Sequence, residues 1–511
     1  MFVSYPGGMI ARMFEAVRGR FGEMVERCHP SATCESAALL ERVGGWARVE
    51  NRAAAEQLVA IGELFAYRLS RCSETEGWAI DTMAAVAAEV GAQLRISQGL
   101  ALSRVRYARA LRERLPKVGE VFAAGDIDYR MFTTIVYRTD LIEDREVLAA
   151  VDARLAADVG RWPSLTLGRL GAQVDTIVAG ADVDAVRRRR ERQRDRQVWF
   201  GEVCEGPAEM GGSLLGPDAH ALDARLDVLA GTVCPLDPRT GEQRRADALG
   251  ALAAGSDRLG CRCGRTDCGA GARRPASPVV VHVIAERATL EGTGSAPGSL
   301  WGADGLISPE LVAELARSAK VVPLVHPGEA PPEQGYVPSK ALADFVRCRD
   351  LTCRWPGCDV SASDCELDHT IPYAQGGPTH AANLKALCKT HHLVKTFWGW
   401  GEKQLPDGTL IVTSPAGRTY VTTPGSALLF PGLCSAVGGM PAVEVDAHPQ
   451  DRRGERTAMM PRRTRTRAQH RAARVAAERR HNREARQAQR TSAAWDPGPR
   501  DAAGDGEPPP F

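Results

Sequence analysis

The protein has 511 residues, of which 44% are hydrophobic and 5% aromatic, and its formal net charge is +2. No apolar run approaches the roughly 20 residues of a membrane-spanning helix, and the segment around Pro6-Gly7-Gly8 does not suit a signal peptide. We therefore expect roughly two to four domains in a cytoplasmic protein without a membrane partner.

Residues 36 to about 180 carry apolar side chains at helical spacing. The clearest examples are residues 53–69, 84–90 and 100–111. Pro116 and the pair Gly125-Asp126 interrupt this pattern, as expected where helices end. No group of catalytic residue types occurs in this region, so we interpret it as a helical scaffold.

Residues 187–196 form an arginine-rich run that includes Glu191 and Asp195. Such a run can lie along a phosphate backbone, and a solvated helix face explains it equally well. Short strand patterns follow near residues 198–200, 212–215 and 279–284, with helical patterns near 219–229 and 242–253 between them. The middle of the chain is therefore interpreted as a mixed α+β region.

Three cysteines, Cys261, Cys263 and Cys268, lie close together in a glycine-rich loop of this region. The chain has 14 cysteines, and without an export signal these favour metal sites and buried thiols over disulfides. The cluster indicates a second zinc site, for which His282 on the following strand is a candidate fourth ligand. A reduced surface loop without metal is the competing interpretation.

Two predicted helices flank a linker ahead of the next motif. Ser308-Pro309 is a typical helix start, and residues 326–338 are rich in Pro and Gly. Ser339 then begins a helix that ends with Arg347 and Arg349. These arginines can bind phosphate, and ordinary solvation at a helix end is the alternative interpretation.

Two pairs of metal-ligand residues frame the segment that follows. Cys353 and Cys358 have four residues between them, and Cys388 and His391 have two. Paired ligands separated by some tens of residues are how proteins assemble a tetrahedral zinc site. We therefore predict a structural Zn²⁺ held by these four side chains.

Between and after these ligands, the pattern predicts a strand, a turn, a second strand or loop, and a helix. Residues 366–371 are short and partly apolar, and residues 375–378 read Gln-Gly-Gly-Pro. Residues 383–396 lead into the helix. A unit of this size has too little apolar surface for an independent core, so we expect the metal to hold it together.

Asp368, His369, Asn383 and His392 lie within this frame, and a structural zinc alone does not require them. Together with the ligand pairs they resemble the signature of the HNH endonuclease family. The resemblance implies that His369 is the general base and that Asp368 and His392 hold a catalytic Mg²⁺ or Mn²⁺. It further implies that Asn383 orients the His369 ring by a hydrogen bond. Zinc is then assigned to His391 and the catalytic ion to His392.

A second resemblance covers the chain from about residue 40 to 320. Segments 111–128 and 237–249 are similar to a bacterial family catalogued as domain of unknown function 222, whose members commonly carry a C-terminal HNH module. This resemblance implies no chemistry. The expected domains are an α-rich domain at 36–320, a linker at 321–338, an HNH nuclease domain at 339–432 and a disordered Arg-rich tail at 437–511.

The C-terminal region combines a predicted hairpin with a basic tail. Trp398, Trp400 and Tyr420, with a turn at Asp407-Gly408, predict a small hairpin packed on the metal module. Residues 451–490 hold 14 Arg against 4 acidic residues, which suits non-specific attachment to nucleic acid. We expect this tail to be disordered, although Ala and Arg at this density also suit a helix.

Taken together, these patterns predict an α+β protein. Its parts are an α-rich N-terminal domain with a small β element, a zinc-stapled ββα-metal (HNH) finger and a disordered basic tail. The expected function is metal-dependent cleavage of DNA by an HNH endonuclease. The alternative is a zinc-dependent nucleic-acid-binding protein of a mobile element or regulatory system that does not cut.

Overall fold

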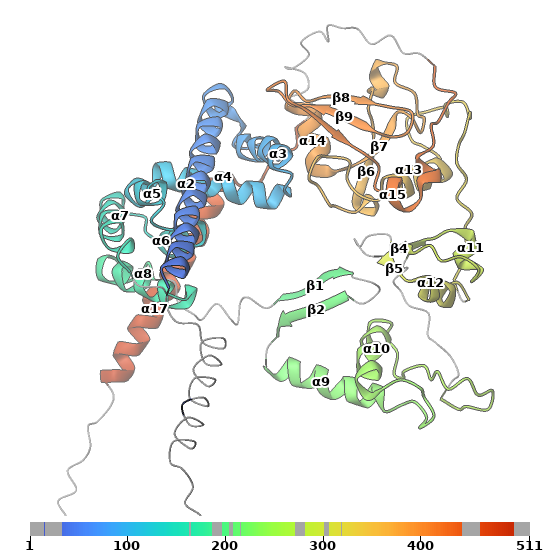
Figure 1. Ribbon diagram of the computed structural model, residues 1–511, viewed down its shortest axis with the longest axis horizontal. Coiled ribbons are helices and arrows are strands. Elements are labelled where there is room, and N and C mark those ends of the chain that lie inside the picture. The colour runs from blue at the N-terminus through green and yellow to red at the C-terminus, as the bar shows by residue number, and fades with distance from the viewer. Residues whose placement is uncertain are drawn as a thin grey trace, which may run out of the picture. The chain divides into compact units, whose positions relative to one another are not determined.

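The computed structural model describes most of the chain (Figure 1). The described residues are Glu15 and the ranges 33–162, 165–186, 197–203, 208–214, 216–270, 282–300, 306–317, 319–441 and 460–494. The chain divides into two compact units, one of Met1–Glu63, Tyr107–Val186 and Arg483–Phe511, and the other of Leu64–Arg106 and Arg187–Asn482. The arginine run at 187–196 lies outside the described residues.

The N-terminal part of the chain is helical, as its apolar spacing predicts. Its elements are α2 (Cys34–Arg71), η1 (Ser73–Thr75), α3 (Thr82–Leu94), α4 (Gln98–Glu113), α5 (Pro116–Ala123), α6 (Tyr129–Thr139), α7 (Arg145–Val159) and α8 (Leu167–Ala181). Short polar side chains cap several of these helices. Asp128 accepts a hydrogen bond from Met131 N, and Thr166 accepts one from Arg169 N.

The core of the first unit forms where helices α5 to α8 pack together. Phe122 and Phe132 are fully buried there, and their stacked rings have centroids 5.1 Å apart. Asp152 of α7 is buried as well and accepts hydrogen bonds from the backbone N–H groups of Lys117 and Val118 at 2.9 and 3.0 Å. Because the carboxylate satisfies free N–H groups at the start of α5, it joins α7 to α5.

The middle of the chain is α+β, as predicted. Strand β1 (Gln197–Val203) pairs antiparallel with β2 (Ala208–Ser213), and α9 (Gly216–Ala230) packs against α10 (Gly241–Ala253). Strands β3 (Val283–Ile284), β4 (Gly298–Leu300) and β5 (Leu306–Ile307) form a small sheet, and α11 (Arg287–Leu290) packs against α12 (Pro309–Ala316). Ser308 caps α12, as its sequence position predicts, by accepting a hydrogen bond from Leu311 N.

The C-terminal part begins at α13 (Lys340–Asp350), which Ser339 caps. Strand β6 (Cys365–His369) pairs antiparallel with β7 (Leu384–Cys388), and α14 (Lys389–Phe397) follows directly. These three elements are the ββα module. A sheet in the order β10-β9-β8 follows, made of β8 (Gly401–Gln404), β9 (Leu410–Thr413) and β10 (Thr419–Thr422). The remaining short elements are η3 (Ala362–Asp364), η4 (Tyr373–Gln375), α15 (Ser426–Leu429) and η5 (Pro431–Cys434).

The ββα module and the β8–β10 sheet share one core with helix α3. The shared cluster includes Ala84, Ala88, Ala92, Trp355, Leu387, Val394 and Leu410. Two hydrogen bonds reinforce this packing: Trp398 Nε1 donates to Ile80 O at 3.2 Å, and Tyr420 OH donates to Gln93 Oε1 at 3.0 Å. The small module therefore gains apolar burial from a helix that is distant in the sequence.

Over the residues of 437–511 that the structure describes, the C-terminal tail differs from the predicted disorder; residues 442–459 and 495–511 lie outside the described residues. Residues Arg467–Ala494 form helix α17, so the helical alternative holds over this stretch. Just before it, Arg463 donates hydrogen bonds to the backbone oxygens of Trp78 and Ala79, and Met460 is buried. Alanine and arginine both have high helix propensity, which accounts for the helix.

Two arginines of this helix pair with an aspartate inside the first unit. Arg483 Nε lies 3.2 Å from one carboxylate oxygen of Asp184, and Arg486 Nη2 lies 2.8 Å from the other. Part of the basic charge of the tail is therefore engaged by the protein itself.

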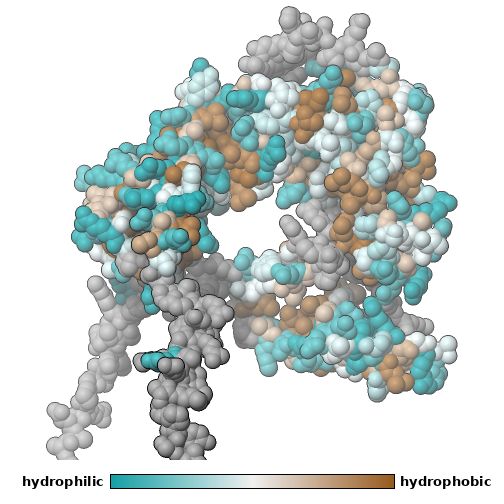
Figure 2. Space-filling model, in the orientation of Figure 1, coloured by the Kyte–Doolittle hydropathy of each residue, from teal (hydrophilic) through white to brown (hydrophobic). Residues whose placement is uncertain are grey.

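No described helix is long and apolar enough to cross a membrane. On the face shown in Figure 2, hydrophilic and hydrophobic residues are mixed in small patches. Among the exposed large apolar side chains are Val198, Trp199 and Phe200 of β1.

We expect Phe122→Ala to lower the free energy of unfolding by about 3–5 kcal/mol, because it leaves a cavity beside Phe132 in a fully buried core. Urea denaturation followed by circular dichroism measures this loss. Leu167→Ala is the matched control, since this side chain is 45% exposed, and its effect should stay within about 0.5 kcal/mol. Equal losses for the two variants would contradict the packing described here.

Candidate metal centres and active site

Three cysteines and one histidine of the C-terminal part converge on one point. The ligand atoms of Cys353, Cys358, Cys388 and His391 all lie within 4.8 Å of one another. His391 Nδ1 is 3.2 Å from the Cys388 sulfur and 3.6 Å from the Cys353 sulfur. Hydrogen bonds with the other two thiols and with His391 hold the pKa of Cys388 well below its ordinary value, which favours the thiolate. Three thiols and an imidazole in this arrangement can hold a metal ion.

Local backbone geometry places these donors. The turn that carries Cys353 and Cys358 is closed by a hydrogen bond from Cys358 N to Trp355 O at 3.1 Å. Cys388 ends β7 and is the N-cap of α14, so His391 lies in the first turn of that helix. The Trp355 ring stacks on the His391 ring with centroids 4.8 Å apart, and both side chains are buried. The donor set is thus shielded by aromatic side chains.

The next residue of α14 faces a different group. His392 Nδ1 lies 2.6 Å from Glu366 Oε2, and its Nε2 lies 3.3 Å from Asp368 Oδ1. Successive residues of a helix point about 100° apart, which explains why His391 and His392 belong to different groups. The structure brings Asp368 and His392 together and adds Glu366, which sequence reasoning missed. Its only signal was its place two residues before Asp368 on the same face of a strand.

A buried cluster of charges holds Asp368. Its Oδ2 accepts hydrogen bonds from Lys385 Nζ at 2.6 Å and from Lys395 Nζ at 2.7 Å. Lys385 is 1% exposed and also lies 2.8 Å from Glu402 of β8. Burial opposes ionisation of Asp368, but the two lysines and His392 hold its pKa well below the usual range. The carboxylate is therefore ionised, with Oδ1 facing His392.

His369 lies at the end of β6 beside two tyrosine rings. Its ring centroid is 5.2 Å from that of Tyr336 and 5.7 Å from that of Tyr373. Its Nε2 lies 3.0 Å from Thr379 Oγ1, and the Thr379 hydroxyl donates to Gly335 O at 2.6 Å. Burial lowers the pKa of His369, which favours the neutral imidazole.

Asn383 does not contact the His369 ring, so the predicted hydrogen bond between them is wrong. Its side chain accepts a hydrogen bond from Ile371 N at 2.8 Å and donates to Ile371 O and Pro378 O at 3.1 and 2.9 Å. These bonds brace the loop between β6 and β7. Thr379, which lies in the same loop, contacts the His369 ring instead.

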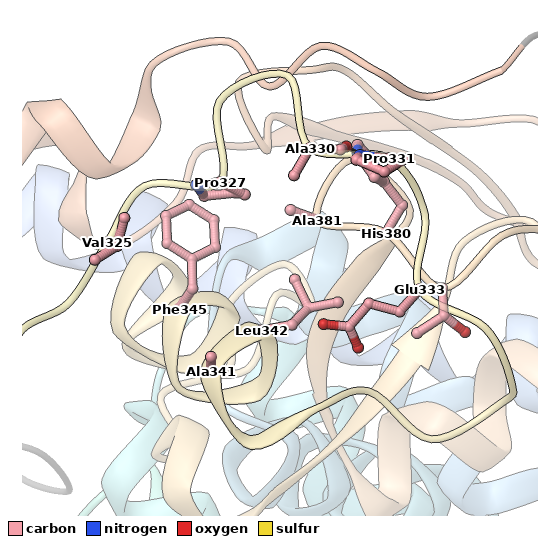
Figure 3. A pocket seen from close by; sticks show the side chains of 11 residues that line it. Val325, Pro327, Ala330, Pro331, Glu333, Ala341, Leu342, Phe345, His380 and Ala381 are labelled. Atoms are coloured by element: carbon pink, nitrogen blue, oxygen red, sulfur yellow. Dashed lines mark hydrogen bonds between the residues drawn. The ribbon is translucent and has the colours of Figure 1, made fainter.

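Residues 325–338 pack against the C-terminal part. Glu333 N donates to Thr379 O at 2.9 Å, which ties this segment to the loop between β6 and β7. A cavity of about 160 Å³ lies between the segment and α13 and is lined partly by Leu342 and Phe345 (Figure 3). Because Gly335 and Tyr336 belong to the same segment, it also forms one wall around His369.

Arg349 is neither available to bind phosphate nor solvated at the helix end, so both expectations for it are wrong. Its side chain is 1% exposed and donates to Asp350 Oδ1 at 2.8 Å, to Ala381 O at 2.7 Å and to Leu384 O at 2.8 Å. These bonds connect α13 to β7 and to the loop before it. Arg349 therefore has a structural role.

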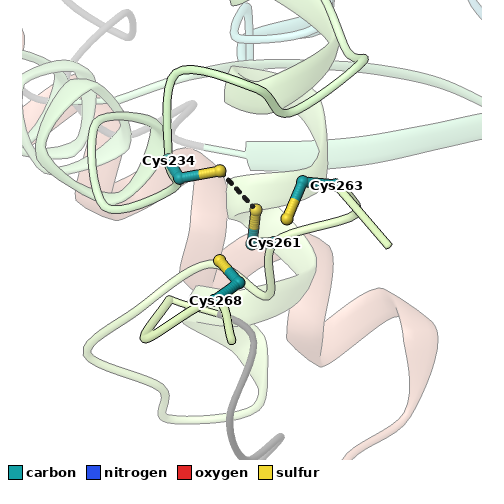
Figure 4. Close-up of side chains that lie close together, drawn as sticks. All are labelled: Cys234, Cys261, Cys263 and Cys268. Carbon is teal, nitrogen blue, oxygen red and sulfur yellow. Dashed lines mark hydrogen bonds between the residues drawn. The ribbon is translucent and has the colours of Figure 1, made fainter. Parts of the chain in front are cut away.

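The three cysteines of the glycine-rich loop also come together, and their fourth neighbour is Cys234. The sulfur atoms of Cys234, Cys261, Cys263 and Cys268 all lie within 4.8 Å of one another (Figure 4). His282, the fourth ligand suggested by the sequence, is exposed and does not belong to this group. Cys234 escaped sequence reasoning because the whole of α10 separates it from the other three.

Comparisons with known proteins agree with both resemblances. The model of a family described as Domain of unknown function (DUF222) matches residues 46–350, and one described as HNH endonuclease matches residues 348–397. The uncharacterized protein Rv2100 of Mycobacterium tuberculosis is 41% identical over 92% of this chain and 91% of its own length. The uncharacterized protein Rv3776 of the same organism is 42% identical over 88% and 90%. No solved structure matches.

We expect the purified protein to hold a metal ion at the three cysteines, and His391→Ala to lose it and to melt at a lower temperature, because His391 faces that donor set. His392→Ala should keep this metal and its melting temperature, since its ring faces Asp368. Elemental analysis and thermal melting of both variants measure the difference. If His392→Ala loses the metal and His391→Ala keeps it, His392 belongs to the cysteine donor set and His391 does not.

Proposed function

Because the chain belongs to the family of the domain of unknown function 222 and carries an HNH endonuclease domain, we propose that it is a metal-dependent endonuclease that hydrolyses phosphodiester bonds of DNA. One observation carries the proposal. A buried neutral histidine, His369, stands next to a carboxylate and imidazole pair, Asp368 and His392, whose facing atoms are 3.3 Å apart. Hydrolysis of a phosphodiester needs a base for water and positive charge for the phosphate; His369 can serve as the base, and Asp368 and His392 can hold the cation that would supply the charge.

The proposed role of Cys353, Cys358, Cys388 and His391 is to hold a structural Zn²⁺. Three thiolates and one imidazole are a common donor set of structural zinc sites, and such a site has no open position for substrate. This ion would fix the turn that carries Cys353 against the start of α14. His392 follows His391 directly, so the same ion would set where His392 lies.

Asp368 and His392 are the proposed ligands of a catalytic Mg²⁺ or Mn²⁺. Ligand atoms that share one octahedral ion lie about 3 Å apart, and the 3.3 Å between Asp368 Oδ1 and His392 Nε2 suits this. A divalent ion bound there supplies Lewis-acid stabilisation of negative charge on the phosphate and the leaving oxygen. Glu366 accepts a hydrogen bond from His392 Nδ1, so that Nε2 would be the nitrogen that binds the ion.

His369 is the proposed general base, and its hydrogen bonds select the reactive atom. Because the Thr379 hydroxyl donates its proton to Gly335 O, its oxygen accepts a hydrogen bond from His369 Nε2. The imidazole then carries its proton on Nε2 and its free lone pair on Nδ1. Nδ1 would accept the proton of the attacking water, and the lowered pKa of His369 keeps this lone pair available near neutral pH.

Nicking of supercoiled plasmid tests the proposal. The purified protein should nick DNA with Mg²⁺ or Mn²⁺ and should stop when EDTA is added. If the protein binds DNA without any nicking at either ion, the non-cleaving nucleic-acid-binding alternative holds and the endonuclease proposal fails.

We expect His369→Ala to reduce the nicking rate by about 10² or more, because the variant lacks the general base but keeps all four proposed zinc ligands. The rate at saturating DNA is the measurement. DNA affinity and zinc content should match those of the unaltered protein, and His220→Ala, at an exposed position of α9, is the matched control. Near-normal nicking by His369→Ala would remove this residue from the mechanism.

Thr379→Val tests the positioning of the base. The variant keeps the shape of the side chain but loses the oxygen that accepts from His369 Nε2. We expect kcat to fall by about 10-fold, a part of the 10²–10⁴ that a general base contributes, with KM for DNA unchanged. Thr379→Ser should restore kcat, whereas a purely structural role for the methyl group predicts that serine fails to do so.

A further inference from the structure

Four thiols meet in the middle region, away from the active site described above. Cys234 follows α9, and Cys261, Cys263 and Cys268 follow α10 (Figure 4). All four sulfurs lie within 4.8 Å of one another, and those of Cys234 and Cys261 are 3.4 Å apart. Sulfur atoms around one tetrahedral zinc lie about 3.8 Å apart, given Zn–S bonds of about 2.3 Å. The 3.4 Å separation is close to this value, and the other sulfurs lie within a 4.8 Å limit that includes it.

A buried ion pair fixes the loop that carries three of these thiols. Asp237 is buried and accepts hydrogen bonds from Arg239 Nη2 at 2.8 Å and from Arg262 N at 2.8 Å. Arg239 Nη2 also donates to Gly260 O at 2.6 Å. Gly260 and Arg262 flank Cys261 in the sequence, so the Asp237–Arg239 pair holds the backbone on both sides of that cysteine. Hydrogen bonds with this ion pair therefore hold the backbone of the loop that carries the thiols.

The α9–α10 region has little apolar core of its own. Within described residues 218–270, the buried apolar side chains are Leu229, Ala248 and Leu259. So few buried groups are insufficient to hold two helices and their loops, and small units of this kind are commonly stabilised by disulfides or a metal. We therefore expect a disulfide or a metal ion to stabilise this region.

We propose that Cys234, Cys261, Cys263 and Cys268 bind a second structural zinc ion, which joins the end of α9 to the loop after α10. Four thiolates that converge on one point form a donor set that zinc prefers in structural sites. Disulfides would instead pair the sulfurs two by two at about 2.05 Å, well below the 3.4 Å between Cys234 and Cys261. The proposal does not depend on the endonuclease activity.

Zinc stoichiometry of the full-length protein, purified with a reductant, tests this proposal. Elemental analysis should give two zinc ions per chain. Cys263→Ser combined with Cys268→Ser should give one, Cys353→Ser should give one, and the combination of all three should give none. His282→Ala and Cys72→Ser are matched controls outside both clusters and should keep two. One zinc per chain in the unaltered protein, unchanged by Cys263→Ser with Cys268→Ser, would overturn the proposal.

Two measurements keep the test decisive if a variant fails to fold. Release of zinc from the unaltered protein by a thiol-blocking mercurial should yield two equivalents, detected with a zinc-sensitive dye. Mass spectrometry after alkylation without reduction should find no disulfide among the four cysteines. A disulfide there, together with one zinc per chain, would replace the metal by a covalent link and refute the inference.

Discussion

The geometry of the active centre depends on one buried set of opposite charges. Lys385 is almost completely buried on β7 and lies within 2.6 and 2.8 Å of the carboxylates of Asp368 and Glu402, while Lys395 adds a second positive charge at 2.7 Å from Asp368. An isolated buried charge would be strongly destabilising, so these groups must stay together. As a result β6, β7, α14 and β8 have one relative arrangement. One carboxylate oxygen of Asp368 accepts hydrogen bonds from both lysines, and the other oxygen faces His392.

Two kinds of constraint meet at the start of α14. His391 belongs to the cysteine cluster that anchors the helix, and His392 belongs to the group around Asp368. The first turn of α14 therefore carries one residue of the cysteine cluster and, directly after it, one residue of the Asp368 group. Around it, α3 and the segment near Met460 complete the core. The ββα module is thus stabilised both by its donor set and by apolar packing from distant parts of the chain.

The two family matches overlap at residues 348–350. The match to the domain of unknown function 222 runs to residue 350, and the segment before α13 supplies Gly335 and Tyr336 to the surroundings of His369. In the same domain, the Asp237–Arg239 pair belongs to a segment by which the family resemblance is identified, and it supports the loop with Cys261 and Cys263. The motif therefore has a physical role as a scaffold for thiols.

By itself, the sequence determined the features that depend on neighbours along the chain. The spacing of the ligand pairs, the helices of residues 36–180, the capping residues Ser308 and Ser339, and the turn at Asp407-Gly408 could all be predicted, because helices, caps and turns are set by local geometry. Tertiary structure decided the rest. It brought Cys234 to the other three cysteines across α10, and it gave Thr379 the hydrogen bond to His369 that was expected of Asn383. It also buried Arg349 and placed lysines around Asp368. Each of these contacts joins residues from different elements. Their separation along the sequence does not determine how far apart they lie in the folded protein, which depends on how the elements pack.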